Sequence, residues 1–352
     1  MTPTHAPHEH APHPHEHDHP DRSVIHWLQH FFTPHSHGHQ QAALDPNLAT
    51  NRGLWALKVS LIALLITAIF QVVIVAISGS VALLADTIHN FSDALTAVPL
   101  GLAFWLSRRA RNKRFTYGYG RAEDIAGVII VLMIAFSAFE AIYQSINKII
   151  HPQPITNLGW VAAAAVIGFI GNETVAVFRI RVGKAIGSAA LVADGYHART
   201  DGFTSLAVLA GATGVWLGFP LLDPIIGLCI GAAILGIVWK SAQDMWHRMM
   251  DAVDPEVYSE FKHTASHVPG VLDVHNAAIR WVGHRLWGEM HVTVNCTITV
   301  LEGHRITEEV RHQLFHNFPA MVEIIVHADP CECDTSVEYH PTMHHHFLPA
   351  AD

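Results

Sequence analysis

The chain has few charged residues and few cysteines, and each shortage excludes a class of protein. Only 14% of its 352 residues are Asp, Glu, Lys or Arg, whereas a soluble domain carries about 25%. Its four cysteines are too few and too scattered for a disulfide framework. The formal net charge of −9, with histidine counted as neutral, argues against a nucleic-acid partner, which favours a basic surface.

No signal peptide is expected at the N-terminus, because no basic segment followed by an apolar run is present there. Residues 1–40 instead alternate histidine with Pro, Glu and Asp, a composition that predicts a disordered tail. The chain has 29 His against 21 Lys and Arg together, and imidazole binds transition metals well. The tail is therefore expected to collect or sense metal, or to be a passive disordered segment.

Half of the residues are hydrophobic, and they are concentrated in the middle of the chain. A membrane-crossing helix needs about 20 mainly apolar residues. Six segments meet this requirement, which predicts a multi-pass α-helical membrane protein with six transmembrane helices in a lipid bilayer. They cover residues 55–77, 81–106, 123–147, 158–180, 187–216 and 221–243.

Basic residues between the predicted spans indicate the orientation. They lie at the ends of spans 4 and 6 or just after spans 2, 4 and 6, whereas the loops between spans 1 and 2 and between spans 5 and 6 contain no Lys or Arg. The positive-inside rule then predicts cytoplasmic N- and C-termini in a cell (inner) membrane. The residues used are Arg108, Arg109, Arg111, Lys113, Arg114, Arg121, Arg179, Arg181, Lys184, Lys240 and Arg248.

The chain becomes polar after about residue 251, where an α+β domain is expected. Asp254 is the expected N-cap of a helix over 255–268, with Pro255 at its first position. The sequence then predicts strands at 274–281 and 288–300, a helix at 306–318 and a strand at 322–327. Four regions are therefore expected: a His-rich tail (1–50), a transmembrane domain (51–248), a cytoplasmic domain (249–333) and a flexible C-terminal tail (334–352).

A repeat links predicted spans 2 and 5. Residues 79–93 and 187–201 share the pattern G-S-x-A-L-x-A-D-x-x-H-x-x-x-D. On a helix, positions i, i+3 and i+7 fall on one face. The pattern thus predicts one metal-ligating face on each span, made of Asp86, His89 and Asp93 and of Asp194, His197 and Asp201.

The two faces together supply a tetrahedral ligand set for Zn²⁺. The expected ligands are His89, Asp93, His197 and Asp201, with Asp86 and Asp194 behind them to orient the two histidines. Each acidic residue at mid-bilayer costs about 2.5–3.5 kcal/mol, which a bound dication or protons would offset. Simple ion pairing between the helices is the alternative.

An intramembrane metalloenzyme and a passive channel are competing functions. A catalytic zinc normally keeps three protein ligands and an open position, whereas four ligands close the site, and the chain contains no H-E-x-x-H. A transporter rather than an enzyme is therefore expected. Protons would compete for the same ligands, because metal ligands must be deprotonated.

The two H-x-x-x-D motifs, six spans and the segment Tyr117–Glu123 (YGYGRAE) give the chain a clear family likeness. Over roughly residues 50–332 it resembles the cation diffusion facilitators. The resemblance implies a homodimeric metal/proton antiporter with a ferredoxin-like cytoplasmic domain. The histidines of both motifs resemble the zinc branch, while cobalt, nickel and cadmium stay open as substrates.

The resemblance also implies metal ligands in the cytoplasmic domain. By position they are His275, His291, His304, His327 and Asp329, to which Cys331 and Cys333 could add. Phe115 and Tyr119 stand where some members have histidines between spans 2 and 3, so no metal site is expected there. Arg121 is expected to pair with Asp251 between the two domains.

Overall fold

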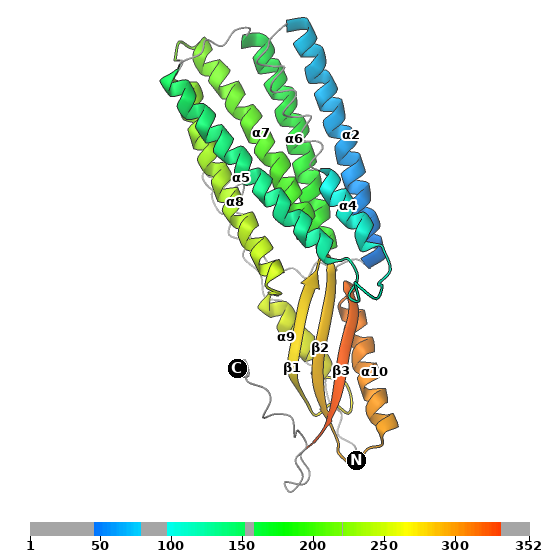
Figure 1. The fold of residues 1–352 in the computed structure, drawn as a ribbon. Helices are drawn as coiled ribbons and strands as arrows, with labels where there is room; N and C mark the ends of the chain where they lie inside the picture. The colour runs from blue at the N-terminus through cyan, green and yellow to red at the C-terminus, as the bar shows by residue number, and fades with distance from the viewer. Residues whose placement is uncertain (1–45, 79–96, 152–157, 220, 332–352) are drawn as a thin grey trace, which may run out of the picture. The chain divides into compact units, whose positions relative to one another are not determined.

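A computed structural model describes residues 46–78, 97–151, 158–219 and 221–331 (Figure 1). Its first part is a bundle of helices. They are α2 (Pro46–Ser78), α4 (Ala97–Ser107), α5 (Arg121–Ile150), α6 (Leu158–Ile186), α7 (Ala189–Trp216) and α8 (Leu222–Met249).

Within these described ranges, four helices are long and apolar enough to cross a membrane, namely α2, α5, α6 and α8. The 28-residue α7 has the length, but Asp194, Arg199 and Asp201 lower its hydropathy. Much of predicted span 2 lies outside the described residues, with α4 as its described end. A helical membrane domain is thus confirmed, while the number of six spans stays a prediction.

Several helices are longer than their apolar segments. α6 continues to Ile186 and α8 to Met249, each six residues past the predicted end. The additional residues include Arg181, Lys184 and Arg248, which are good helix formers once the chain has left the apolar layer. Hydropathy alone therefore locates the membrane-crossing part of each helix but not its end.

Much of the interior of the bundle is apolar, and so is much of its outer surface. Leu100, Phe104, Ile130 and Leu191 are fully buried. On the outside, large apolar side chains are more than half exposed, including Phe70, Leu132, Phe136, Phe139 and Ile170. Many exposed large apolar side chains on the outside of a helix bundle are typical of contact with lipid.

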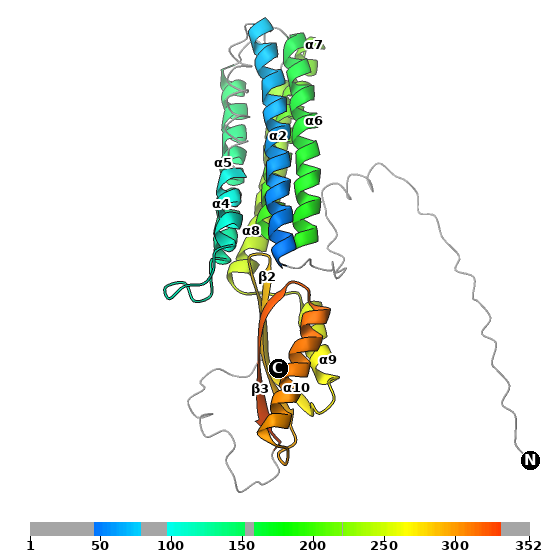
Figure 2. The same ribbon diagram turned by 90° about the vertical axis from the view of Figure 1, so that its right-hand side faces the viewer.

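The second part is an α+β domain made of α9 (Pro255–Ser266), β1 (Asp273–Val282), β2 (Arg285–Val294), α10 (Val300–Asn317) and β3 (Met321–Pro330). The sheet order is β1-β2-β3, with β1 and β2 antiparallel and β2 and β3 parallel. Both helices cover the same face of the sheet (Figure 2). Phe261, Met290, Val292, Leu314 and Ile324 form the core between the two layers.

The helix starts in this domain have clear chemical causes. Asp254 caps α9, its side chain accepting from the Glu256 N–H, and Pro255 follows at the first position, as the sequence predicts. The prediction was wrong around residue 300: β2 ends at Val294, and α10 begins at Val300, six residues before the expected start. Thr299 and Glu302 form a capping box that fixes this start.

Candidate metal sites

Three histidines form one row across the cytoplasmic sheet. His275 on β1 is the register partner of His291 on β2, which is in turn the partner of His327 on β3. The imidazole centroids are 5.5 Å apart for the first pair and 4.8 Å apart for the second. Strand pairing therefore gathers histidines that are distant along the chain.

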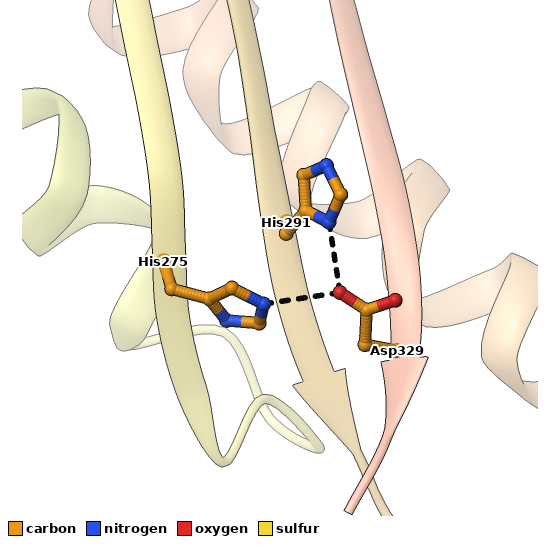
Figure 3. Close-up of side chains that lie close together, drawn as sticks. All are labelled: His275, His291 and Asp329. Carbon is orange, nitrogen blue, oxygen red and sulfur yellow. Dashed lines mark hydrogen bonds and ion pairs between the residues drawn. The ribbon is translucent and has the colours of Figure 1, made fainter. Parts of the chain in front are cut away.

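The carboxylate of Asp329 lies beside the three histidines. Asp329 follows His327 by two residues, so both side chains lie on the same face of β3. Its Oδ2 is 3.0 Å from His275 Nε2 and 2.8 Å from His291 Nδ1 (Figure 3), and its Oδ1 is 3.1 Å from His327 Nε2. One carboxylate thus contacts three imidazoles.

These donor atoms fit a transition metal. The ligating atoms of His275, His291 and Asp329 lie within 4.8 Å of one another. Zn²⁺ binds imidazole nitrogen and carboxylate oxygen at about 2.0–2.2 Å, so tetrahedral ligand atoms are about 3.3 Å apart. The Asp329 oxygen is 3.0 and 2.8 Å from the two imidazole nitrogens, which is close to this value. The Asp329 side chain is 6% exposed and that of His327 is 62% exposed, so the site is open to water on the His327 side.

An irregularity in β1 lies directly beside this site. The pairing of β1 with β2 shifts between His275 and Ala278, and Asn276 has a φ of 47°. Asparagine tolerates this left-handed conformation better than most residues. Bulges of this kind re-aim neighbouring side chains, here at the position of His275.

The remaining predicted cytoplasmic ligands are not in the row. His304 is exposed on α10. This helix covers the sheet face on which Met290 and Val292 are buried (Figure 2), whereas His291, which lies between them in the strand, is on the other face. The Cys331 Sγ accepts a hydrogen bond from the Cys296 backbone N–H at 3.3 Å, and Cys333 lies outside the described residues. The chain by itself therefore brings together four of the five predicted ligands.

In the bundle, α7 carries the second copy of the repeat. Asp194, His197 and Asp201 are buried, with 0%, 2% and 6% exposure. His197 Nδ1 is 3.9 Å from Asp201 Oδ1, one helical turn away. The first copy, with Asp86, His89 and Asp93, lies outside the described residues, so the four-ligand site stays a prediction.

Asp194 has a partner that the sequence did not suggest. Arg179 on α6 places Nη1 3.0 Å from Asp194 Oδ2, and the two side chains are 1% and 0% exposed. A second pair between the same helices joins Arg199 on α7 to Glu173 on α6, at 2.7 and 3.2 Å. The sequence did contain one indication of such pairs. Ionisable residues in an apolar, membrane-crossing segment are rare unless they are paired.

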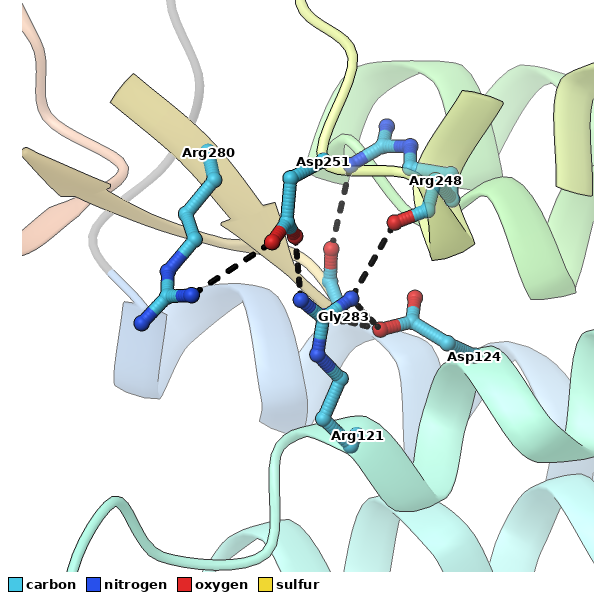
Figure 4. A network of polar contacts seen from close by, with 6 residues as sticks. All are labelled: Arg121, Asp124, Arg248, Asp251, Arg280 and Gly283. Carbon is cyan, nitrogen blue, oxygen red and sulfur yellow. Dashed lines mark hydrogen bonds and ion pairs between the residues drawn. The ribbon is translucent and has the colours of Figure 1, made fainter. Parts of the chain in front are cut away.

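Between the bundle and the α+β domain lies a polar network (Figure 4). Arg121 on α5 forms an ion pair with Asp251 and donates to the Arg248 carbonyl at 3.1 Å. Arg280 on β1 reaches the other Asp251 oxygen at 3.4 Å. Arg121 and Asp251, the pair that the resemblance suggested, therefore form an ion pair. They are part of a network that also includes Arg248 and Arg280.

An apolar helix bundle with buried ligand-type residues, joined to a domain with a histidine and carboxylate cluster, defines a membrane protein that handles metal cations. Comparisons with known proteins agree. Residues 57–247 match the family model described as "Cation efflux transmembrane domain", and residues 253–331 match "Cation efflux protein, cytoplasmic domain". The chain belongs to the cation diffusion facilitator family of metal efflux transporters, as its sequence motifs predicted.

Individual relatives extend along most of the chain. It is 49% identical over 322 residues to the Mycobacterium tuberculosis (strain ATCC 25618 / H37Rv) protein described as "Probable cation efflux system protein Rv2025c", covering 91% of this chain and 97% of that one. It is 28% identical over 278 residues to "Metal tolerance protein 2" of Oryza sativa subsp. japonica, covering 71% and 72%.

A solved variant of the MamM CTD is 27% identical to this chain and covers 22% of it and 95% of the solved chain, with a TM-score of 0.21. The family model for the cytoplasmic domain bears the short name ZT_dimer, which indicates dimerisation. Members of this family are transporters, so the expectation that the chain is not an enzyme is confirmed.

Proposed function

We propose that the chain exports Zn²⁺ from the cytoplasm in exchange for protons by alternating access. The proposed ligands are His89, Asp93, His197 and Asp201. Asp86 and Asp194 are proposed to lie behind them. The observation that supports this most directly is the burial of His197 and Asp201 one turn apart on α7. Burying such groups in a membrane is costly, and a bound dication or proton offsets the cost.

Proton entry offsets part of the electrical cost of exporting Zn²⁺. Moving a dication out against 100 mV, inside negative, costs about 4.6 kcal/mol, at about 2.3 kcal/mol per charge. Each proton that returns releases about 2.3 kcal/mol from the same potential. One proton per Zn²⁺ therefore halves the electrical cost. Histidine, with a reference pKa of about 6.5, is suited to exchange that proton near physiological pH.

The setting of the transporter is part of this proposal. We assign it to the inner membrane, with both termini in the cytoplasm and residues 51–248 forming the transmembrane domain. Residues 249–333 are the cytoplasmic domain, through which two copies form a homodimer, and residues 1–50 and 334–352 are tails. His275, His291, His327 and Asp329 are assigned a regulatory Zn²⁺ site there, whereas His304, exposed on α10, stays a separate prediction from the sequence.

Transport in reconstituted vesicles tests the proposal. The full chain is placed in liposomes with a zinc-sensitive dye inside and an imposed pH gradient. Zinc uptake that rises with the gradient is expected, and gradient-insensitive flux contradicts exchange. His197→Ala is expected to abolish uptake, whereas His247→Ala, which changes an exposed histidine of the same bundle, leaves it intact. Competition by cobalt, nickel and cadmium determines whether zinc is preferred.

A further inference from the structure

The turn between β1 and β2 inserts its two residues into the end of the helix bundle. His284 is 2% exposed. Its Nδ1 is 2.7 Å from Glu123 Oε2 on α5, its Nε2 is 2.9 Å from Thr50 Oγ1 on α2, and its ring centroid is 5.8 Å from that of Phe104 on α4. One side chain of the cytoplasmic domain thus contacts three helices.

The preceding residue, Gly283, is equally enclosed. Its N–H donates to Asp124 Oδ2 at 3.1 Å, and its carbonyl accepts from Arg248 Nη1 at 3.1 Å (Figure 4). Its φ is 61°, and an added Cβ would lie 2.8 Å from Glu123 Oε2 and 2.9 Å from the Gly120 carbonyl oxygen. Only glycine fits this turn, on grounds of conformation and of space.

Two residues that hold the turn also hold the start of α7. Glu123 accepts from His284 with one oxygen and from the Ser188 hydroxyl with the other. Arg248 donates to the Gly283 carbonyl through Nη1 and to the Gly187 carbonyl through Nη2, at 3.0 Å. The turn and the first residues of α7 are therefore linked twice through shared partners.

Ser188 is the N-cap of α7, and its hydroxyl accepts from the Leu191 N–H at 3.1 Å. Asp194 follows six residues later, about 9 Å along the helix at 1.5 Å per residue. His197 and Asp201 continue on the same face. A displacement of the capped end is thus transmitted to the ligand face, because a helix moves as a stiff element.

We propose that His284 is a positioning residue for transport: through Glu123 and Ser188 it holds the N-terminal end of α7, and with it the face of His197 and Asp201, in the binding geometry. This inference rests on the proposed function. It assigns to the cytoplasmic domain a mechanical connection, through Glu123, to the helix that carries His197 and Asp201, separate from the metal cluster on its sheet.

The test measures zinc uptake by the full chain in liposomes as a function of zinc concentration. His284→Ala is expected to raise the half-saturating concentration about tenfold, which corresponds to about 1.4 kcal/mol. Ser188→Gly breaks the contact with Glu123 but keeps a residue tolerated at an N-cap, so it is expected to shift half-saturation in the same direction. The double variant is expected to equal the stronger single variant.

Two further variants separate positioning from folding. His284→Asn places a side-chain N–H near the position of Nδ1 and is expected to restore wild-type half-saturation. His312→Ala, which removes an exposed histidine of α10, is expected to change nothing. A purely structural role lowers the amount of active protein, and thus the maximal rate, without moving half-saturation. That result overturns the inference.

Hydrogen exchange provides a readout that does not depend on transport. In detergent without zinc, His284→Ala is expected to speed exchange of the amides of residues 191–197, whereas His312→Ala leaves them unchanged. Equal exchange in wild type and His284→Ala overturns the inference. If wild-type vesicles take up no zinc under the pH gradient, the proposed function fails, and hydrogen exchange decides the role of His284 on its own.

Discussion

Arg179 and Asp194 form an ion pair that is almost completely enclosed between α6 and α7, with Nη1 3.0 Å from Oδ2. Removing one partner from a charge pair buried this deeply leaves the other charge without compensation.

We predict that Asp194→Asn destabilises the bundle by about 3–5 kcal/mol, because it leaves the Arg179 charge buried and uncompensated. The double variant Arg179→Met with Asp194→Leu is expected to recover most of this loss. Thermal unfolding of the purified protein in detergent measures both.

The pair between Glu173 and Arg199 is the matched control, since it joins the same two helices with side chains 19% and 17% exposed. Glu173→Gln is expected to cost about 1 kcal/mol or less. Equal losses from Asp194→Asn and Glu173→Gln would show that burial does not set the strength of these pairs.

Gly195 allows α6 and α7 to approach closely beside the ligand face. A Cβ at this position would lie 2.6 Å from Ile180 Cγ1 and 3.0 Å from the Ile180 backbone nitrogen. Gly195→Ala is therefore expected to cost about 1–3 kcal/mol through overpacking and to lower zinc uptake. Gly236→Ala has no neighbour within 4 Å and is expected to be neutral or stabilising by up to about 1 kcal/mol. Loss of stability in both variants would contradict the close-packing argument.

Metal at the cytoplasmic row is expected to stabilise the folded domain. With free zinc at about 100 times the dissociation constant, linkage gives about 2.7 kcal/mol, and a chelator removes it. Asp329→Ala is expected to abolish this part of the stabilisation because it removes the carboxylate that contacts all three histidines. His304→Ala is expected to retain the full effect, measured as the zinc-dependent change in Tm. A smaller shift in His304→Ala would place that residue in the site, for example across a dimer.

The capping box of α10 gives the domain an acid-sensitive contribution. The backbone N–H and hydroxyl of Thr299 both hydrogen-bond to Glu302 and lower the pKa of its carboxyl from the ordinary value of 4.5. A carboxyl with a lowered pKa in the folded state stabilises it above about pH 4.5 and loses that contribution as pH falls through the folded value. Glu302→Gln is therefore expected to flatten the dependence of Tm on pH below 4.5, as measured by thermal unfolding of the purified protein at a series of pH values.

The features that could be predicted from the sequence are those determined by hydrophobic periodicity or by side chains close together in the chain. The apolar segments indicate the membrane helices, and Asp254 with Pro255 indicates the start of α9, because each signal lies within a few residues of its effect. The Thr299 and Glu302 signal was equally local. It was overlooked because the alternation of 288–300 continued into the turn, so α10 was expected six residues too late.

Long-range pairing was less accessible. Arg179 counts as one more positive charge at the end of a span until α6 is packed against α7, where it faces Asp194. His284 looks like an ordinary turn residue until the hairpin meets Glu123, which lies 161 positions away in the sequence. Both contacts depend on how two helices, or a hairpin and a helix, pack against each other. The spacing of residues along one helix or strand does not predict that packing.

The alignment of His275, His291 and His327 has a consequence for folding. Successive side chains of a strand point to opposite faces, so a slip of one residue in either pairing would move a histidine to the helix-covered face. The same slip would bring a core residue such as Met290 or Val292 into water. Zinc would bind such a misaligned sheet weakly and the correct one tightly, so the ion would favour the native pairing during assembly. Metal supply would then influence how much of this protein folds correctly, before any ion is transported.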